Sequence, residues 1–254
     1  MKVLGLDTST MTSGIAVVDG DRVLAEARHD ASGRKADLLV AIDDCCKRAG
    51  VGPKDLDAVA VGAGPGSFTG LRIGMATAKG IAFATGKPLW AVSSLAALAF
   101  DASQDPIAIK RTWGIPGGAF IAALDARRGE VYAGCYHADE TTNGWTLIGE
   151  ERVLAPRDLA TWVDQVTGKL YGDWNGLYLS YAGDALAAHP AELGTLGGLW
   201  LDAKTPSGVS VARLALSGAR VDVLVGGGPT YIRPSEAEVM YPDGVPGALR
   251  RRDP

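Results

Sequence analysis

Two periodicities alternate along the first hundred residues of the chain. Short apolar runs, several of them rich in β-branched residues, are typical of buried strands. They predict five strands, at 3–8, 14–18, 22–28, 58–61 and 90–92. Apolar positions at helical spacing predict helices over 35–49 and 70–85, and Ser93 is a good N-cap for a third helix that ends near Phe100. The predicted order is β-β-β-α-β-α, followed by one more strand and helix.

The same order begins again after 101–118, a stretch with two prolines, three glycines and no clear period. Four further strands are predicted, at 119–125, 130–139, 145–153 and 177–183. A helix begins at Pro156, and a last amphipathic helix covers 208–219. The repeated series indicates a duplication. We therefore expect two lobes and a C-terminal tail: 1–105 joined by the 208–219 helix, 106–207, and 220–254.

The composition is that of a soluble globular protein, with 254 residues of which 47% are apolar and 21% charged. The net charge of −4 and the isoelectric point of about 5.4 argue against a protein that binds nucleic acid on its own. One basic cluster, Arg250 to Arg252, falls in the tail, where we expect it to be solvated.

Three cysteines without a CxxC motif favour reduced thiols in a cytoplasm. Asp7 interrupts the apolar N-terminus, so we expect no signal peptide. No apolar run reaches the roughly eighteen residues of a membrane span. The predicted location is cytoplasmic.

The first half is centred on the run from Ala58 to Gly86, in which a strand, a glycine-rich turn and a helix follow one another. Amides at a helix N-terminus point toward whatever occupies such a turn, so the corner resembles an anion site. The turn is not a P-loop, because no Lys-Ser/Thr pair follows its last glycine. Pro65 stands where a nucleophile elbow around Ser67 needs glycine, so we expect Ser67 to cap the helix.

Small residues recur every four positions along that helix, at Gly70, Gly74, Ala78 and Ala82. Such a seam lets another backbone approach closely. Each glycine lowers helix stability by about 1 kcal/mol relative to alanine, so we expect a close packing contact to compensate for it. Two interpretations stay open: the seam meets a helix of another protein, or it packs on the chain's own sheet.

Asp7 and Asp125 each end the first strand of one half. Across a cleft, the two carboxylates could hold Mg²⁺ and phosphate oxygens; alternatively, each caps the turn that follows its strand. A strand feeding a glycine turn at 223–229 could pass under an adenine, although glycine-rich loops are common. The three histidines show no HxxxH or HExxH spacing, which argues against metal-dependent hydrolysis; they are His29, His137 and His189.

Four segments of the chain carry a family resemblance. They are LGLDTS near the N-terminus, DAVAVGAGPGSFTGLRIGMATAKGIA, ALDARRGEVYAGCY in the second half, and PTYIRPSEAEVMYP at 229–242. The second of them is long and highly specific. Together they resemble the TsaB (YeaZ) family of tRNA threonylcarbamoyladenosine biosynthesis proteins, and they touch both halves and the tail.

The resemblance implies a bilobal α/β fold of the actin/sugar-kinase/Hsp70 class, a duplicated RNase H-like β-β-β-α-β-α unit. It also implies a non-catalytic scaffold or activating subunit for a TsaD-type catalytic paralogue. With a TsaE-type ATPase, such complexes transfer a threonylcarbamoyl group from its adenylate to N6 of the adenosine just 3′ of the tRNA anticodon. The implied chain needs no cofactor of its own, since its partners use the ATP; it forms homodimers when alone and meets tRNA only through the complex.

The family's protein contacts are made by its first two helices, here 35–49 and 70–85. The implied interface residues are Leu38, Leu39, Ile42, Cys46, Gly70, Arg72, Gly74, Met75, Ala78 and Ala82. A degenerate nucleotide site would comprise Asp7, Thr8, Ser9 and Asp125, with no catalytic or metal-ligating residue. Two alternatives remain: an ATP–Mg²⁺-using enzyme with Asp7 and Asp125 on the metal, and a peptidase-like protein, for which no nucleophile–base pair is identifiable.

Overall fold

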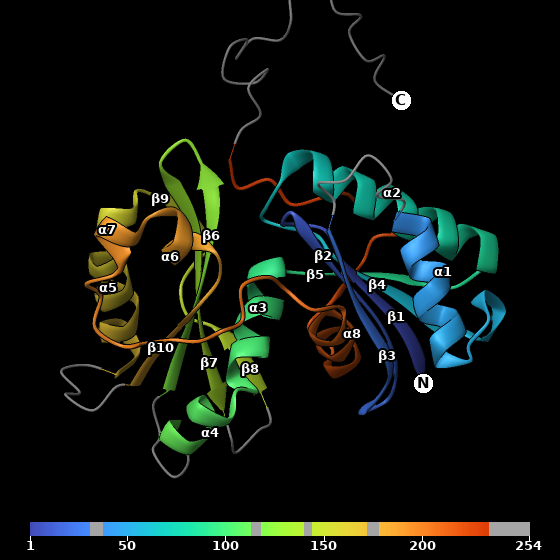
Figure 1. Ribbon diagram of the computed structural model, residues 1–254, viewed down its shortest axis with the longest axis horizontal. Helices are drawn as coiled ribbons and strands as arrows, with labels where there is room; N and C mark the ends of the chain where they lie inside the picture. Colours follow the sequence, from blue (N-terminus) through green and yellow to red (C-terminus); the bar gives the residue numbers. More distant parts are fainter. Residues whose placement is uncertain (31–37, 113–117, 140–143, 172–177, 234–254) are drawn as a thin grey trace, which may run out of the picture.

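The computed structural model describes residues 1–30, 38–112, 118–139, 144–171 and 178–233, which form two lobes built on two sheets (Figure 1). The first sheet has the strand order β12-β5-β4-β1-β2-β3. Its strands are β1 Lys2–Asp7, β2 Thr12–Asp19, β3 Arg22–Asp30, β4 Ala58–Gly62, β5 Leu89–Val92 and β12 Val221–Asp222. The second sheet has the order β11-β10-β6-β7-β8, and β9 pairs with β7. Its strands are β6 Gly118–Arg127, β7 Glu130–Asp139, β8 Gly144–Leu147, β9 Arg152–Leu154, β10 Tyr178–Ala182 and β11 Leu199–Trp200.

The two sheets share one connectivity. In the first, β1, β2 and β3 form an antiparallel meander, while β4 and then β5 continue from β1 in parallel. In the second, β6, β7 and β8 form the meander, while β10 and then β11 continue from β6 in parallel. The predicted fold class, a duplicated RNase H-like unit, is confirmed.

The helices form layers around these sheets (Figure 1). Helices α1 (Leu38–Ala49) and α2 (Phe68–Thr85) cover the outer face of the first sheet, and α5 (Leu159–Tyr171) covers the outer face of the second. Helices α3 (Ser94–Ser103) and α8 (Gly208–Ser217) lie between the sheets and touch each other. Apolar side chains of α8 pack on the first sheet, and most of those of α3 pack on the second.

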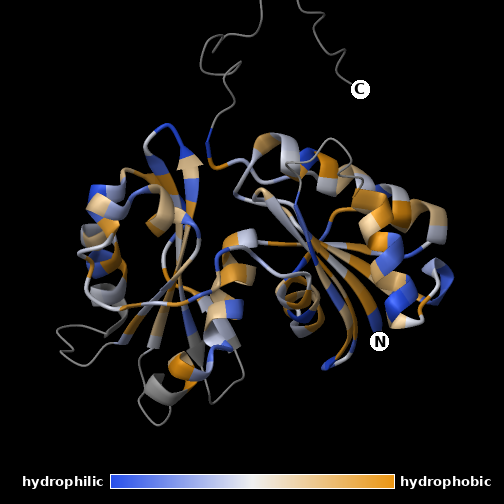
Figure 2. Ribbon diagram, in the orientation of Figure 1, coloured by the Kyte–Doolittle hydropathy of each residue, from blue (hydrophilic) through white to orange (hydrophobic). Residues whose placement is uncertain are grey.

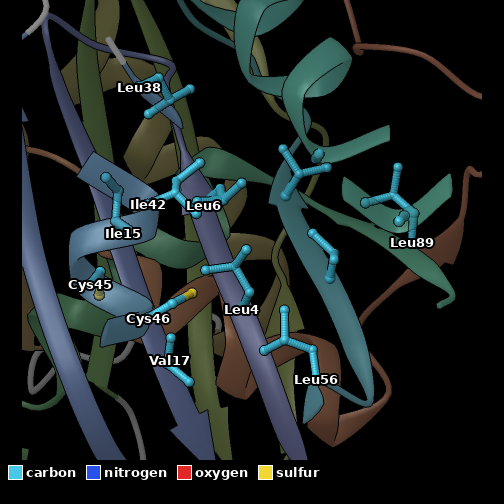
Figure 3. Packing of buried hydrophobic residues seen from close by; sticks show 14 of the residues in the cluster. Leu4, Leu6, Ile15, Val17, Leu38, Ile42, Cys45, Cys46, Leu56 and Leu89 are labelled. Atoms are coloured by element: carbon cyan, nitrogen blue, oxygen red, sulfur yellow. The ribbon is translucent and has the colours of Figure 1, made fainter. Parts of the chain in front are cut away.

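Alternation along β1 explains how one strand serves two layers. Leu4 and Leu6 point into the core under α1 and α2, where Figure 3 shows them beside Ile42 and Cys46, while Val3 belongs to the core under α8. Gly5 faces α8, where an added Cβ would lie 2.0 Å from the Gly208 carbonyl oxygen. Glycine at this position therefore allows α8 to rest directly on the sheet.

The structure corrects the single strand predicted at 145–153. Gly149, in the left-handed region at a φ of 79°, lies between β8 and β9, and both short strands pair with β7. The helix predicted from Pro156 begins as the 3₁₀ turn η2 (Pro156–Asp158) and continues as α5. Short elements in the irregular stretches were not predicted: the 3₁₀ turn η1 (Pro53–Asp55), α4 (Pro106–Thr112), α6 (Ala185–Ala188), α7 (Pro190–Leu193) and β11. Residues 35–37 and 177, which begin two predicted elements, lie outside the described residues.

The stretch predicted as a tail starts within the first lobe. Val221 and Asp222 pair with β5 as strand β12, and Val223 is buried in the core under α2. The strand expected at the start of 223–229 is therefore wrong, because pairing ends at Asp222. Residues 234–254, including the basic cluster, lie outside the described residues.

Hydrophobic residues follow the central strands and also appear on α1 and α2 (Figure 2). Among the described helices, none combines the length and the apolar character needed to cross a membrane.

Candidate functional site

The small-residue seam of α2 packs on the chain's own first sheet. A Cβ added to Gly70 would lie 2.1 Å from the Thr8 carbonyl oxygen, and one added to Gly74 would lie 2.0 Å from Thr8 Oγ1. Ala78 and Ala82 are fully buried in the same core. The seam is therefore filled from within the chain, and it is not open to a helix of another protein.

The glycine turn before α2 is likewise filled by protein. Ser67 N donates to Ser9 O at 2.7 Å, and a Cβ on Gly66 would lie 2.5 Å from the same oxygen. Gly64 exchanges hydrogen bonds with Ser94 at the start of α3: its N–H donates to Ser94 Oγ, and its carbonyl accepts from Ser94 N. Ser67 Oγ accepts from Gly70 N, which confirms Ser67 as the N-cap of α2. The turn thus holds three elements together at the end of β1.

Asp7 lies in the middle of this junction and is fully buried. One carboxylate oxygen accepts from Ser9 N at 2.8 Å and Ser9 Oγ at 2.5 Å, and the other accepts from Ser94 Oγ at 2.7 Å. Desolvation raises the pKa of Asp7, although the hydrogen bonds from Ser9 and Ser94 oppose that shift. The neighbouring Thr8 Oγ1 donates to Gly70 O. Asp7 therefore caps the turn after β1 and ties it to α3.

Asp125 occupies the equivalent place in the second lobe. Its Oδ1 accepts from Arg127 N at 2.8 Å, as Asp7 accepts from Ser9 N two residues on. Its Oδ2 lies 3.1 Å from the Arg127 guanidinium, and His189 Nε2 lies 3.5 Å from Oδ1. Asp184 Oδ1 accepts from Asp125 N, and desolvation raises the pKa of Asp184. Both aspartates hence cap turns, which is the second of the two interpretations that their spacing left open.

A cleft of about 770 Å³ opens between the lobes. It is lined by the turn after β1, the N-terminus of α2, the β6–β7 hairpin, Asp184 and the segment 230–233. Of the predicted nucleotide-site residues, Ser9 and Asp125 line the cleft, whereas Asp7 and Thr8 do not. Four arginines line the cleft: Arg72, Arg127, Arg128 and Arg233. Sequence reasoning named Arg72 only as an interface candidate and missed the other three, although two of the family segments contain them.

The segment 227–233 crosses from one lobe to the other beside this cleft. On the first lobe, Thr230 N donates to Ala63 O at 2.7 Å, and Tyr231 Oη accepts from Arg72 Nε at 3.2 Å. On the second lobe, Arg233 donates to Ala126 O at 3.0 Å and lies 3.2 Å from Glu130. Residues that follow the last sheet strand thus link the two lobes, a contact that no sequence pattern predicted.

The predicted interface residues divide into two groups. Leu39 and Arg72 are exposed, whereas Leu38, Ile42, Cys46, Gly74, Met75, Ala78 and Ala82 are buried and Gly70 lies against Thr8. The side chains of this second group pack within the chain itself, so they are not exposed on its surface. The exposed side of α2 instead carries Ile73, Ala76, Gly80 and Phe83, called here the outer stripe.

Comparison with known proteins places the chain in a family. Residues 31–165 match the family profile described as TsaD, tRNA N6-adenosine threonylcarbamoyltransferase. The tRNA threonylcarbamoyladenosine biosynthesis protein TsaB of Bacillus subtilis is 32% identical over 254 residues, which cover 95% of this chain and 98% of that protein. The TsaB protein of Escherichia coli is 33% identical over 170 residues, covering 66% and 69%.

A solved structure gives the same result. YeaZ from Pseudomonas aeruginosa superposes with a TM-score of 0.70 at 28% identity, over 91% of this chain and 99% of that one. The sequence relative at full length and the structural relative carry the two names of one family. The chain belongs to the TsaB (YeaZ) family of tRNA threonylcarbamoyladenosine biosynthesis proteins.

Proposed function

We propose that the chain is a non-catalytic accessory subunit of the complex that installs N6-threonylcarbamoyladenosine in tRNA. It binds a TsaD-type transferase through the exposed faces of α1 and α2. A TsaE-type ATPase joins the same complex in the cytoplasm, tRNA is reached only through it, and free chains pair as homodimers through the same face. The proposal starts from the names of the relatives, which assign them to tRNA threonylcarbamoyladenosine biosynthesis.

The observation that carries the docking face is Gly80. Unlike Gly70 and Gly74, Gly80 has no atom of a packing neighbour within 4 Å of an added Cβ among the described residues, so no packing seen in that part of the chain requires glycine there. Glycine in a helix interior nevertheless costs about 1 kcal/mol relative to alanine. A partner backbone that approaches the outer stripe closely accounts for this cost.

Exposed apolar side chains occur on both helices of the proposed face. Phe83 is 77% exposed and Ile73 is 51% exposed, and Leu39 and Val40 of α1 are exposed as well. Helix α1 also carries two exposed ion pairs, Asp43 with Lys47 and Asp44 with Arg48. An apolar centre with charged groups around it is the ordinary anatomy of a protein interface.

Two contacts favour the non-catalytic role over the rival functions. Asp7, which an ATP–Mg²⁺ enzyme would place on the metal, is buried and bonded to Ser9 and Ser94. Ser67, which a peptidase would use as nucleophile, accepts a hydrogen bond from Gly70 N as a helix cap.

The test is co-purification of a tagged TsaD-type protein with variants of this chain. Ile73→Asp places a charge in the centre of the proposed interface, and it should lower the retained amount at least about tenfold, the loss expected when a buried apolar anchor becomes charged. Ile107→Asp on α4 is the matched control, since Ile107 is 55% exposed and also lies on a helix. Both variants should keep the wild-type circular dichroism spectrum. Equal retention of Ile73→Asp and Ile107→Asp would contradict the proposed docking face.

A further inference from the structure

The fold class implies ATP with Mg²⁺ between the lobes, but the residues of the cleft do not fit the metal. Asp7 is fully buried and does not line the cleft. Asp125 lines it, but the guanidinium of Arg127 lies 3.1 Å from its Oδ2 and already balances its charge. Among the described residues, no group of three histidine, cysteine, aspartate or glutamate side chains is placed to hold a metal ion.

Positive charge exceeds negative charge in the cleft. Four arginines and two carboxylates, Asp125 and Asp184, line it. Arg233 is matched by Glu130, and Arg127 is matched by Asp125. Arg72 has no carboxylate within salt-bridge distance in the part of the chain that the structure describes; its guanidinium instead stacks 3.7 Å from the Phe68 ring and donates from Nε to Tyr231. Within the described residues its two terminal nitrogens have no hydrogen-bond partner, so they remain as donors beside the cleft.

The hairpin between β6 and β7 holds arginines in backbone conformations that arginine rarely adopts. Arg127 and Arg128 have φ angles of 62° and 57°, in the left-handed region that favours glycine and asparagine. Arg128 and Gly129 form the two-residue turn of the hairpin, for which asparagine or glycine is the usual first residue. Strain of this kind is typical of functional sites. Both arginines line the cleft, which gives a reason for the unfavourable residue choice.

We propose that the cleft binds an organic phosphate without a divalent metal ion. The guanidinium of Arg72 supplies the positive charge, and Arg127, whose Nη1 lies against Asp125, donates hydrogen bonds to the phosphate from its other nitrogens. Guanidinium groups bind phosphate through paired charge-assisted hydrogen bonds and need no metal to do so. The first turn of α2, which carries no acidic residue, borders the same space. Phe68, Tyr132 and Tyr231 supply ring surface for the organic part of the ligand. The inference goes beyond the proposed scaffold role and does not depend on it.

Calorimetric titration of the full chain tests the site with two probes, ATP and inorganic pyrophosphate, each in EDTA and again with excess Mg²⁺. We expect ATP to bind in EDTA, more tightly than pyrophosphate, and to bind more weakly with Mg²⁺ because the metal occupies the oxygens that the arginines need. Arg127→Asn should raise the dissociation constant of ATP at least about tenfold, and so should Arg72→Gln. Asparagine suits the left-handed backbone at 127, so the fold should be kept.

Arg157→Asn is the matched control, because Arg157 is an exposed arginine on η2 outside the cleft lining, and it should bind ATP like the wild type. Three results would overturn the proposal: no binding of ATP at millimolar concentration in EDTA, binding that requires Mg²⁺, or equal affinity in Arg127→Asn and Arg157→Asn. Pyrophosphate binding as tight as ATP would overturn the organic part of the assignment. Retention of the TsaD-type partner by Arg127→Asn keeps this result separate from the scaffold role.

Discussion

At the scale of single residues, two buried aspartates hold the inner helices in place. Asp7 bonds to Ser94 at the start of α3, and Asp101 near its end accepts from Ser207 N at 2.7 Å and from the hydroxyls of Ser207 and Ser210. Desolvation raises the pKa of both carboxyl groups. Each aspartate thus gives up favourable solvation of its charge in return for linking α3 to a neighbouring element.

These raised pKa values predict a pH dependence of stability. Because the folded state binds a proton at Asp7 and Asp101 more readily than the unfolded state, their contribution to stability is largest below the ordinary aspartate pKa of about 3.9. It is lost as the pH rises from there through the raised folded pKa. We expect Asp101→Asn to lose this part of the pH dependence, as measured by urea unfolding of variant and wild type at a series of pH values. Parallel curves for the two proteins would contradict this assignment.

Removing the Asp7 carboxylate altogether should be costly. Asp7→Ala leaves the Ser9 amide and the Ser9 and Ser94 hydroxyls without their buried acceptor, at a cost of about 1–3 kcal/mol in the free energy of unfolding. Asp7→Asn keeps one carbonyl acceptor and should cost less. Urea denaturation measures the difference, and an Asp7→Ala variant as stable as the wild type would show that these hydrogen bonds do not matter.

At the scale of elements, the two faces of α2 differ in their surroundings: one packs on the first sheet and the other is exposed. Its inner face uses glycine and alanine to rest on β1 and on the turn after it, and its outer stripe combines Gly80 with exposed Ile73 and Phe83. Small residues on both faces look the same in the sequence. Only the inner ones are explained by the chain itself.

A pair of glycine variants should show this difference in the isolated protein. Gly74→Ala brings a methyl group to about 2.0 Å from Thr8 Oγ1 unless α2 moves, so we expect a loss of about 1–3 kcal/mol of stability. Gly80→Ala meets open space and improves helix propensity, so we expect a gain of about 0.5–1 kcal/mol. Unfolding by urea measures both changes, and the same sign for the two variants would contradict the assignment of the faces.

At the scale of the whole molecule, the lobes are joined by the inner helices and by the segment 227–233. That segment bonds to Ala63 and Arg72 on one side and to Ala126 and Glu130 on the other. It therefore borders the cleft and connects its two walls. On the second lobe the segment is attached through Arg233, which contacts the Ala126 carbonyl oxygen and the Glu130 carboxylate.

Arg233→Ala should loosen that end without unfolding the protein. The loss of a 3.0 Å hydrogen bond and a partly solvated ion pair is worth about 1 kcal/mol or less, so global stability should change little. Hydrogen exchange of the β6–β7 hairpin should become faster, while exchange in α1 should stay unchanged. Unaltered exchange in the hairpin would mean that Arg233 does not restrain it.

Much of this protein follows from its sequence alone. The spacing of apolar side chains largely determines local structure, so most of the strands, the long helices and the repetition of the two halves were predictable from it. Ser67 was identified as a helix cap from its residue type and position. The break within the predicted strand 145–153 was missed because one glycine, Gly149, produces it through its left-handed backbone angle.

The tertiary structure decided what each face of those elements touches. The glycines of α2 are equivalent in the sequence, and only the packing of α2 on the first sheet makes them different. Thr8 lies against Gly70 and Gly74, whereas in the described part of the chain no packing neighbour lies against Gly80. The cleft likewise combines segments far apart in the chain, around Ser9, Arg72, Arg127, Asp184 and Tyr231. Local periodicity contains no information about such distant neighbours, so the arginines of the cleft become a candidate site only when folding brings them together.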